Sequence, residues 1–155
     1  MRTWAPKGQT PLLRYSFNWT HLTVIAALGD RKFYFRFVQG AIQKKQIVDF
    51  LRSLLKQTGR KLLIVWDRLP GHRSKIVTDY LASTNGKIVM EYLPGYAPEL
   101  NPTEYIWAYA KQHELANLCR NTISEVKAFA ARRFQSMQRR SALIASFWKQ
   151  SGLTN

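Results

Sequence analysis

The hydrophobic pattern of the chain changes its period near residue 40, and this change limits how the chain can fold. Phe33, Phe35 and Phe37 alternate with polar or charged residues, so residues 32–37 are expected to form a half-buried antiparallel strand. The next apolar residues recur at the spacing of one helix face: Ile47, Phe50, Leu51, Leu54 and Leu55. Gly59 is the expected C-terminal stop of this helix. The chain therefore combines strands with amphipathic helices.

Short apolar runs and helical stripes continue to alternate after this point. Strands are expected at 20–28, 61–66 and 87–92, with a further short one at 11–17, and Gly29-Asp30 predicts a hairpin turn. The strand at 61–66 is expected to be buried on both faces because it is short and mostly apolar. Further helices are expected at 74–81, at 101–115, and along two stripes within 126–137 and 143–148. The order favours an α/β fold, a mixed sheet flanked by helices, in one domain spanning 1–155.

The charge of the chain points to a polyanionic partner. There are 24 basic residues against 9 acidic ones, which gives a formal net charge of +15. Nucleic acid is the leading candidate and acidic lipid the second, with a generic basic surface as the alternative. No apolar run approaches the ~20 residues of a membrane helix, and the first residues lack a signal-peptide pattern. A single cysteine, Cys119, excludes an intrachain disulfide, so a cytoplasmic location is expected.

Asp67 directly follows the apolar run at 62–66. The carboxyl ends of strands are where open α/β sheets place ligand sites, although a turn or capping role is an even alternative. His72 can orient Asp67 or contact a phosphate, and its alternative is a surface loop histidine.

Glu104 begins a predicted helix and also has a local explanation. Asn101 can be the N-cap, Pro102 the first helical residue and Glu104 the third, which is a variant of the capping box. A carboxylate there can also face the end of the preceding strand, so the two roles are compatible. Glu99 is a competing carboxylate, but its loop position is less rigid.

Two segments together resemble the second and third acidic motifs of DDE transposases. They are Val65-Trp66-Asp67-Arg68-Leu69-Pro70-Gly71-His72-Arg73-Ser74 and Tyr92-Leu93-Pro94-Gly95-Tyr96-Ala97-Pro98-Glu99-Leu100-Asn101-Pro102-Thr103-Glu104. The branch is the one that unites mariner elements with a group of bacterial insertion-sequence transposases. Residues 2–11, 111–117 and the tail around 147–149 are also similar to that bacterial group.

This resemblance implies a ribonuclease-H-like fold and a DNA-cleaving, strand-transferring transposase that uses two divalent ions, Mg²⁺ or Mn²⁺. Asp67 and Glu104 correspond to the second and third metal-binding carboxylates, with His72 and Asn101 as supporting residues. The metals would activate water or a DNA 3′-hydroxyl for an in-line attack on phosphorus, without a covalent protein intermediate.

The chain departs from the family pattern at its start. In the family, a first aspartate lies on the first central strand, shortly upstream of a segment like Arg2–Pro6, whereas here Met1 directly precedes that segment. Asp30 is the only acidic residue before Asp49 and lies in a predicted turn. We therefore expect a C-terminal part of a transposase, without the helix-turn-helix region and with exposed apolar strand edges. A frameshifted second frame, a decayed element or a misplaced start codon would each produce it.

Basic residues near the acidic motifs and on the last helices are the candidates for contacts with the DNA backbone. They are Arg68, Arg73, Lys111, Arg132, Arg133, Arg139 and Arg140. For any single pair, a solvated helix face is the alternative. Three functions remain open: a transposase catalytic core, acting as a homo-oligomer or with an upstream-frame portion; a non-catalytic DNA-binding remnant; and an RNA-binding protein.

Overall fold

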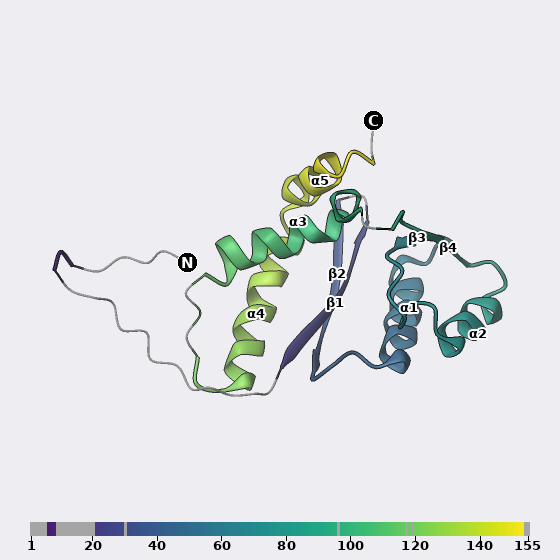
Figure 1. Cartoon of the computed structure of the whole chain (residues 1–155), viewed down its shortest axis with the longest axis horizontal. Coiled ribbons are helices and arrows are strands. Elements are labelled where there is room, and N and C mark those ends of the chain that lie inside the picture. Colours follow the sequence, from purple (N-terminus) through teal and green to yellow (C-terminus); the bar gives the residue numbers. More distant parts are fainter. Residues whose placement is uncertain are drawn as a thin grey trace.

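The first two strands form the predicted antiparallel hairpin (Figure 1). In the computed structural model, which describes residues 6–8, 21–29, 31–95, 97–116, 118 and 120–153, these strands are β1 (Leu22–Gly29) and β2 (Lys32–Gln39). Gly29 lies opposite Lys32, and Arg31 has a left-handed φ of 54° in the turn between them. The predicted turn residue Asp30 and the predicted strand at 11–17 lie outside the described residues.

A βαβ unit follows the hairpin. Helix α1 (Lys44–Thr58) leads into β3 (Leu62–Trp66), α2 (Lys75–Ser83) and β4 (Ile88–Tyr92), and β3 and β4 pair in parallel. The stripe predicted for α1 is largely confirmed, because four of its five residues are buried. Gly59 ends α1 with a left-handed φ of 63° and donates its N–H to the Leu55 carbonyl, as expected for a helix C-terminus.

Three helices complete the chain after a short 3-10 helix, η1 (Pro98–Leu100). Helix α3 (Pro102–Tyr109) continues as a π-helical segment, η2 (Ala110–Glu114), so the predicted helix at 101–115 is present in two geometries. Helices α4 (Ile123–Gln138) and α5 (Ser141–Gln150) contain the last two predicted stripes. All three helices pack beside the hairpin (Figure 1).

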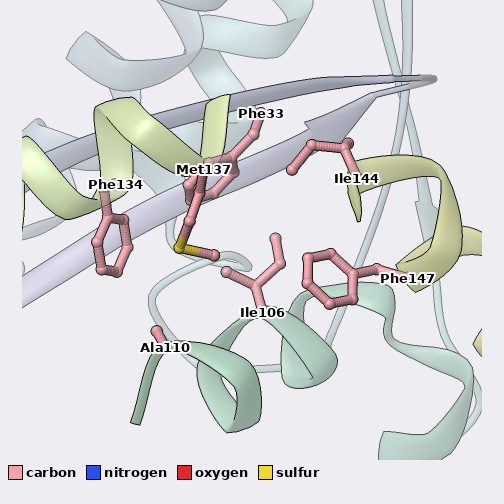
Figure 2. Close-up of a cluster of buried hydrophobic side chains, with 7 residues drawn as sticks. All are labelled: Phe33, Ile106, Ala110, Phe134, Met137, Ile144 and Phe147. Carbon is pink, nitrogen blue, oxygen red and sulfur yellow. The ribbon is translucent and has the colours of Figure 1, made fainter. Parts of the chain in front are cut away.

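The main hydrophobic core lies between the hairpin and these C-terminal helices. Phe134 of α4 packs against all three phenylalanines of β2, with ring centroids 5.2–5.7 Å apart. Figure 2 shows Met137, Ile144 and Phe147 closing the same cluster over Ile106 of α3. The alternation predicted for residues 32–37 is therefore confirmed, because the phenylalanine face of β2 is the one that is covered.

Helix α1 lies across both strand pairs. Ile25 of β1 and Ile64 of β3 pack on the same second core, beneath Ile47 and Leu51 of α1. Even so, β1 and β2 are not hydrogen-bonded to β3 and β4 among the described residues, so the mixed sheet consists of two separate pairs. Between the pairs lies a cleft with a volume of about 730 Å³, lined by residues 25–29 of β1 and by β3.

The expectation that residues 61–66 are buried on both faces is wrong. The side chains of β3 alternate, so that Leu62, Ile64 and Trp66 pack in the core under α1, while Leu63 and Val65 are 66% and 45% exposed. The reason is that α1 and α2 cover only one face of this strand pair. An apolar run of five residues does not by itself show how many faces are covered.

Candidate functional site

Three of the predicted site residues line the cleft near the carboxyl end of β3. Asp67 follows the last residue of the strand, His72 lies in the loop after it, and Asn101 approaches from the start of α3. The Nδ1 atom of His72 lies 2.8 Å from Oδ1 of Asp67. The imidazole also stacks flat on Trp66, with ring centroids 4.1 Å apart and planes 1° apart.

One carboxylate oxygen of Asp67 is fully used in this arrangement. Oδ1 accepts the backbone N–H of Leu69 at 3.1 Å and faces His72, while no described residue forms a hydrogen bond or ion pair with Oδ2. The side chain of Asp67 is 44% exposed and that of His72 is 18% exposed. The predicted turn role of Asp67 is thus present through Oδ1, and Oδ2 is left available to a ligand.

The cap at the start of α3 is only half of a capping box. The Asn101 side chain accepts the backbone N–H of Thr103 at 3.2 Å, and Pro102 is the first helical residue, as expected. The N–H of Asn101 donates to the Pro98 carbonyl at 3.0 Å, and the reciprocal bond to the Glu104 carboxylate is not formed. Glu104 is exposed and its carboxylate has no partner among the described residues, so the cap does not account for this side chain.

The residues present suit a hard divalent cation. Mg²⁺ is usually held by one or two carboxylates, with water and substrate phosphates as its other ligands. Asp67 and Glu104 offer carboxylate oxygens without partners in the described part of the chain, and Glu104 comes directly after residues 101–103 on the cleft wall. Within the described part of the chain there is no group of three or more His, Cys, Asp or Glu side chains suited to a metal.

The basic residues next to the acidic motifs have different surroundings. Arg68 donates from Nε to the Leu93 carbonyl at 3.1 Å, which ties the loop after β3 to the end of β4. Arg73 and Lys111 are exposed, the latter on the π-helical segment.

The four arginines predicted on the last helices fall into two stripes. Arg132 and Arg139 lie seven residues apart, are exposed, and have no ion-pair partner among the described residues. Arg133 and Arg140 form the neighbouring stripe and both face Glu114. Arg133 Nη2 lies 2.6 Å from Glu114 Oε2 as an ion pair without a well-directed hydrogen bond, while Arg140 donates to Oε1.

Glu114 is a residue that the sequence patterns miss. Its side chain is 2% exposed at the end of the π-helical segment, where the two arginines neutralise its charge. The hydrogen bond to this carboxylate raises the pKa of Arg140 above its usual range, and Tyr109 adds to the effect by accepting from Nη1 at 3.0 Å. The partners lie 19 and 26 residues along the chain, so no local spacing connects them to Glu114.

No helix within the described residues is long and apolar enough to cross a membrane.

Comparison with known proteins identifies both the family and the fold. A family profile described as "DDE superfamily endonuclease" matches residues 1–127. No curated protein matches the sequence.

The chain is also similar to solved structures of the Mos1 mariner transposase. The paired-end complex with Mn has a TM-score of 0.65 at 19% identity, and the match covers 98% of this chain and 46% of that one. The paired-end complex with Mg has a TM-score of 0.59 at 19% identity, covering 96% and 48%. The Mos1 catalytic domain has a TM-score of 0.53 at 17% identity, covering 87% and 79%. The fold is therefore ribonuclease-H-like, and this chain spans about half the length of the proteins in the two complexes.

Proposed function

The chain belongs to the DDE superfamily endonuclease family, and on this basis we propose that it is the catalytic domain of a transposase of the bacterial insertion-sequence group. The proposed reaction is metal-dependent cleavage of DNA, followed by transfer of the DNA 3′ end to a target strand. One observation supports this most. At the end of β3, Asp67 is fixed through Oδ1, and its other carboxylate oxygen has no hydrogen-bond or ion-pair partner among the described residues.

In this proposal Asp67 and Glu104 bind two divalent ions, Mg²⁺ or Mn²⁺. Bound metal supplies Lewis-acid activation of the attacking oxygen and stabilises the leaving oxygen. His72 holds Asp67 in place through its contact with Oδ1, and Asn101 fixes the first turn of α3, from which Glu104 projects. The Mos1 complexes were crystallised with Mn or with Mg, which supports the choice of ion.

The proposed partner is DNA at transposon ends and at the target. The Mos1 strand-transfer and paired-end complexes support this choice, and the net charge of +15 favours contacts with the phosphate backbone. Arg73, Lys111, Arg132 and Arg139 are the candidates for these contacts that are exposed and form no hydrogen bond or ion pair with the described residues. The proposal includes assembly with a second copy or with an upstream-frame transposase portion, in the cytoplasm.

A cleavage assay on a supercoiled plasmid and on end-labelled oligonucleotides, with Mg²⁺ or Mn²⁺, tests the proposal. Asp67→Asn and Glu104→Gln should each abolish a metal-dependent product. Glu99→Gln is the matched control, because Glu99 is an exposed carboxylate five residues before Glu104. Loss of activity in Glu99→Gln with an active Glu104→Gln would show that the third carboxylate is assigned wrongly.

The same assay separates the alternatives. DNA binding that needs no metal, with no cleavage by the unmodified chain, would identify a non-catalytic DNA-binding remnant. RNA that outcompetes DNA at matched salt would contradict both the transposase and the DNA-binding remnant, and would favour an RNA-binding protein.

A further inference from the structure

A separate, smaller pocket lies at the outer side of the hairpin, between β2, α1 and the last residue of α4, Gln138. We call it the outer pocket. Its volume of about 100 Å³ exceeds what one or two ordered water molecules need, so a phosphate group can enter it. Neither Asp67 nor Glu104 lines this pocket, which sets it apart from the candidate metal site.

Arg36 is the one charged residue among the described residues of this wall. Its side chain is partly buried on β2, and no described residue forms a hydrogen bond or ion pair with its guanidinium. Helix α1 faces it with apolar or neutral side chains only, namely Phe50, Ser53, Leu54 and Gln57. Partial burial removes water from a charged group, and this is costly unless an acceptor replaces the water. An anion in the outer pocket would supply that acceptor.

Two hydroxyl groups of the wall are also free to donate. Gln57 Nε2 donates to Ser53 Oγ at 2.9 Å, so this oxygen already accepts a hydrogen bond, and its own proton has no acceptor among the described residues. Tyr34 lies two residues before Arg36, on the same face of β2. Its hydroxyl has no hydrogen-bond partner in the described part of the chain. A ligand that offers only acceptors satisfies both hydroxyls.

The outer edge of β2 adds a backbone donor. The N–H of Gly40 donates to the His21 carbonyl at 2.7 Å, so the even-numbered residues of β2 bond to β1 and the odd-numbered ones point to the outer edge. The Phe33 carbonyl agrees with this register, because it accepts from Gln138 Nε2 at 2.5 Å. The N–H of Phe35 therefore points outward on the wall of the outer pocket and pairs with no other strand.

A guanidinium, two hydroxyls and a backbone N–H thus surround a pocket whose described wall has no carboxylate. We propose that the outer pocket binds a phosphate group. Arg36 contacts two of its oxygens, because the fork of a guanidinium matches the geometry of phosphate. The hydroxyls of Tyr34 and Ser53 bond to the remaining oxygens. The phosphate belongs to a nucleic-acid backbone or is free inorganic phosphate, and the binding does not depend on DNA cleavage.

The side-chain Nε–H signal of Arg36 in a nitrogen–proton correlation spectrum of the whole chain tests the proposal. Arg36→Gln identifies the signal by its loss. The probe is sodium phosphate, with the ionic strength kept constant by sodium chloride. The Arg36 signal should shift to saturation, while that of Arg52, which pairs with Asp49, should not move. Equal shifts of both signals would overturn the proposal, because phosphate would then act only as a salt.

Three substitutions measure the contribution of each donor to phosphate affinity. Tyr34→Phe and Ser53→Ala each remove only a hydroxyl, and each should weaken binding at least about tenfold, the usual effect of losing one hydrogen bond to a charged group. Arg36→Gln should abolish saturable binding. Arg52→Gln is the matched control, because it removes the same charge from α1 beside Ser53 and should leave the affinity unchanged.

Thermal unfolding gives a second readout and shows that each variant folds. A ligand that binds only the folded chain raises the unfolding temperature as its concentration rises. Phosphate should do so in the unmodified chain and in Arg52→Gln, and not in Arg36→Gln. An equal rise in Arg36→Gln would overturn the proposal. So would unchanged phosphate affinity in both Tyr34→Phe and Ser53→Ala.

Short duplex DNA, added without metal, distinguishes the two sources of phosphate. If DNA shifts the Arg36 signal and inorganic phosphate reverses the shift, the ligand is a backbone phosphate. If inorganic phosphate shifts the signal and DNA does not, the ligand is free phosphate. An equal response to sodium acetate would overturn the assignment to phosphate, and no response to any of the three would overturn the site itself.

Discussion

His72 holds Asp67 by one oxygen only, because its Nδ1 lies 2.8 Å from Oδ1 and no described residue forms a hydrogen bond or ion pair with Oδ2. The imidazole is itself fixed by stacking on Trp66, the last residue of β3. A side chain locked by packing in this way fixes the orientation of the carboxylate that it contacts. The arrangement is typical of residues that orient a metal ligand without binding the metal.

We expect His72→Phe to keep the stack on Trp66 and to lose the contact with Asp67. Metal-dependent cleavage should fall about 10- to 100-fold, the usual effect of removing a partner of a metal ligand. His72→Asn places an amide donor near the position of Nδ1 and should recover part of the activity. The measurement is the rate of cleavage as a function of Mg²⁺ concentration, with thermal unfolding followed in parallel.

A merely structural role would give a different pattern. In that case His72→Phe would change the unfolding temperature and not the Mg²⁺ concentration needed for half-maximal rate. Rescue by His72→Asn is the second criterion, since an asparagine does not restore the aromatic stack.

The helices and strands could be predicted because they depend on local patterns. Phe33, Phe35 and Phe37 alternate, and the structure buries them on one face. Asn101, the N-cap of α3, and Gly59, the C-cap of α1, bond to neighbouring backbone groups. Their residue types were therefore sufficient to predict these two helix ends.

What the sequence did not predict depends on residues far apart in the chain. Leu63 and Val65 are exposed because α1 and α2 cover only one face of the β3–β4 pair, and an apolar run of five residues does not show how many faces are covered. The role of Arg133 and Arg140 was assigned from charge alone, whereas a single buried carboxylate, Glu114, determines where both point. Spacing along one helix could not show this.

The core between α4 and β2 should be the most sensitive to truncation. Phe134 is 2% exposed and touches three aromatic rings of β2, so Phe134→Ala should lower the free energy of unfolding by about 3–5 kcal/mol. Phe129→Ala is the matched control, because Phe129 is on the same helix, is only half-buried, and lies beneath the guanidinium of Arg120. Urea unfolding followed by circular dichroism measures both. Equal losses would mean that this cluster is not the centre of the core.

Neutralising Glu114 should destabilise the contact between η2 and the last helices. Glu114→Gln removes the charge that Arg133 and Arg140 face and should lower the free energy of unfolding by about 1.5–3 kcal/mol. Both arginines are at least 40% exposed and can be rehydrated, which keeps the loss below that of a fully buried pair. Glu125→Gln, in the exposed first turn of α4, is the control. An unchanged unfolding midpoint in Glu114→Gln would contradict this account of the cluster.

Gly59 should resist substitution because of its backbone conformation. At φ 63° an L-residue is strained, so Gly59→Ala should cost about 1 kcal/mol although space around its Cβ is open. Gly95 is equally open and does not have a positive φ, so Gly95→Ala should leave stability unchanged or slightly raised. Thermal unfolding of the two variants compares them directly. Equal losses in the two variants would mean that the positive φ does not account for the cost at Gly59.

Arg132 and Arg139 should contribute more to DNA binding than an arginine that already forms an ion pair, such as Arg52. They lie seven residues apart along α4 and its C-terminal end, so they share one face of the helix and can follow a phosphate backbone. Each phosphate contact adds about 0.9 to the slope of log K against log salt for duplex DNA. Arg132→Gln and Arg139→Gln should therefore each reduce that slope by about 0.9 and weaken binding to all sequences alike. Arg52→Gln changes the net charge equally but removes an arginine that pairs with Asp49 on α1, and it should leave the slope unchanged. Fluorescence anisotropy at a series of salt concentrations measures this slope for all three variants. An equal reduction of the slope in Arg52→Gln would mean that the overall charge, and not this helix face, determines binding.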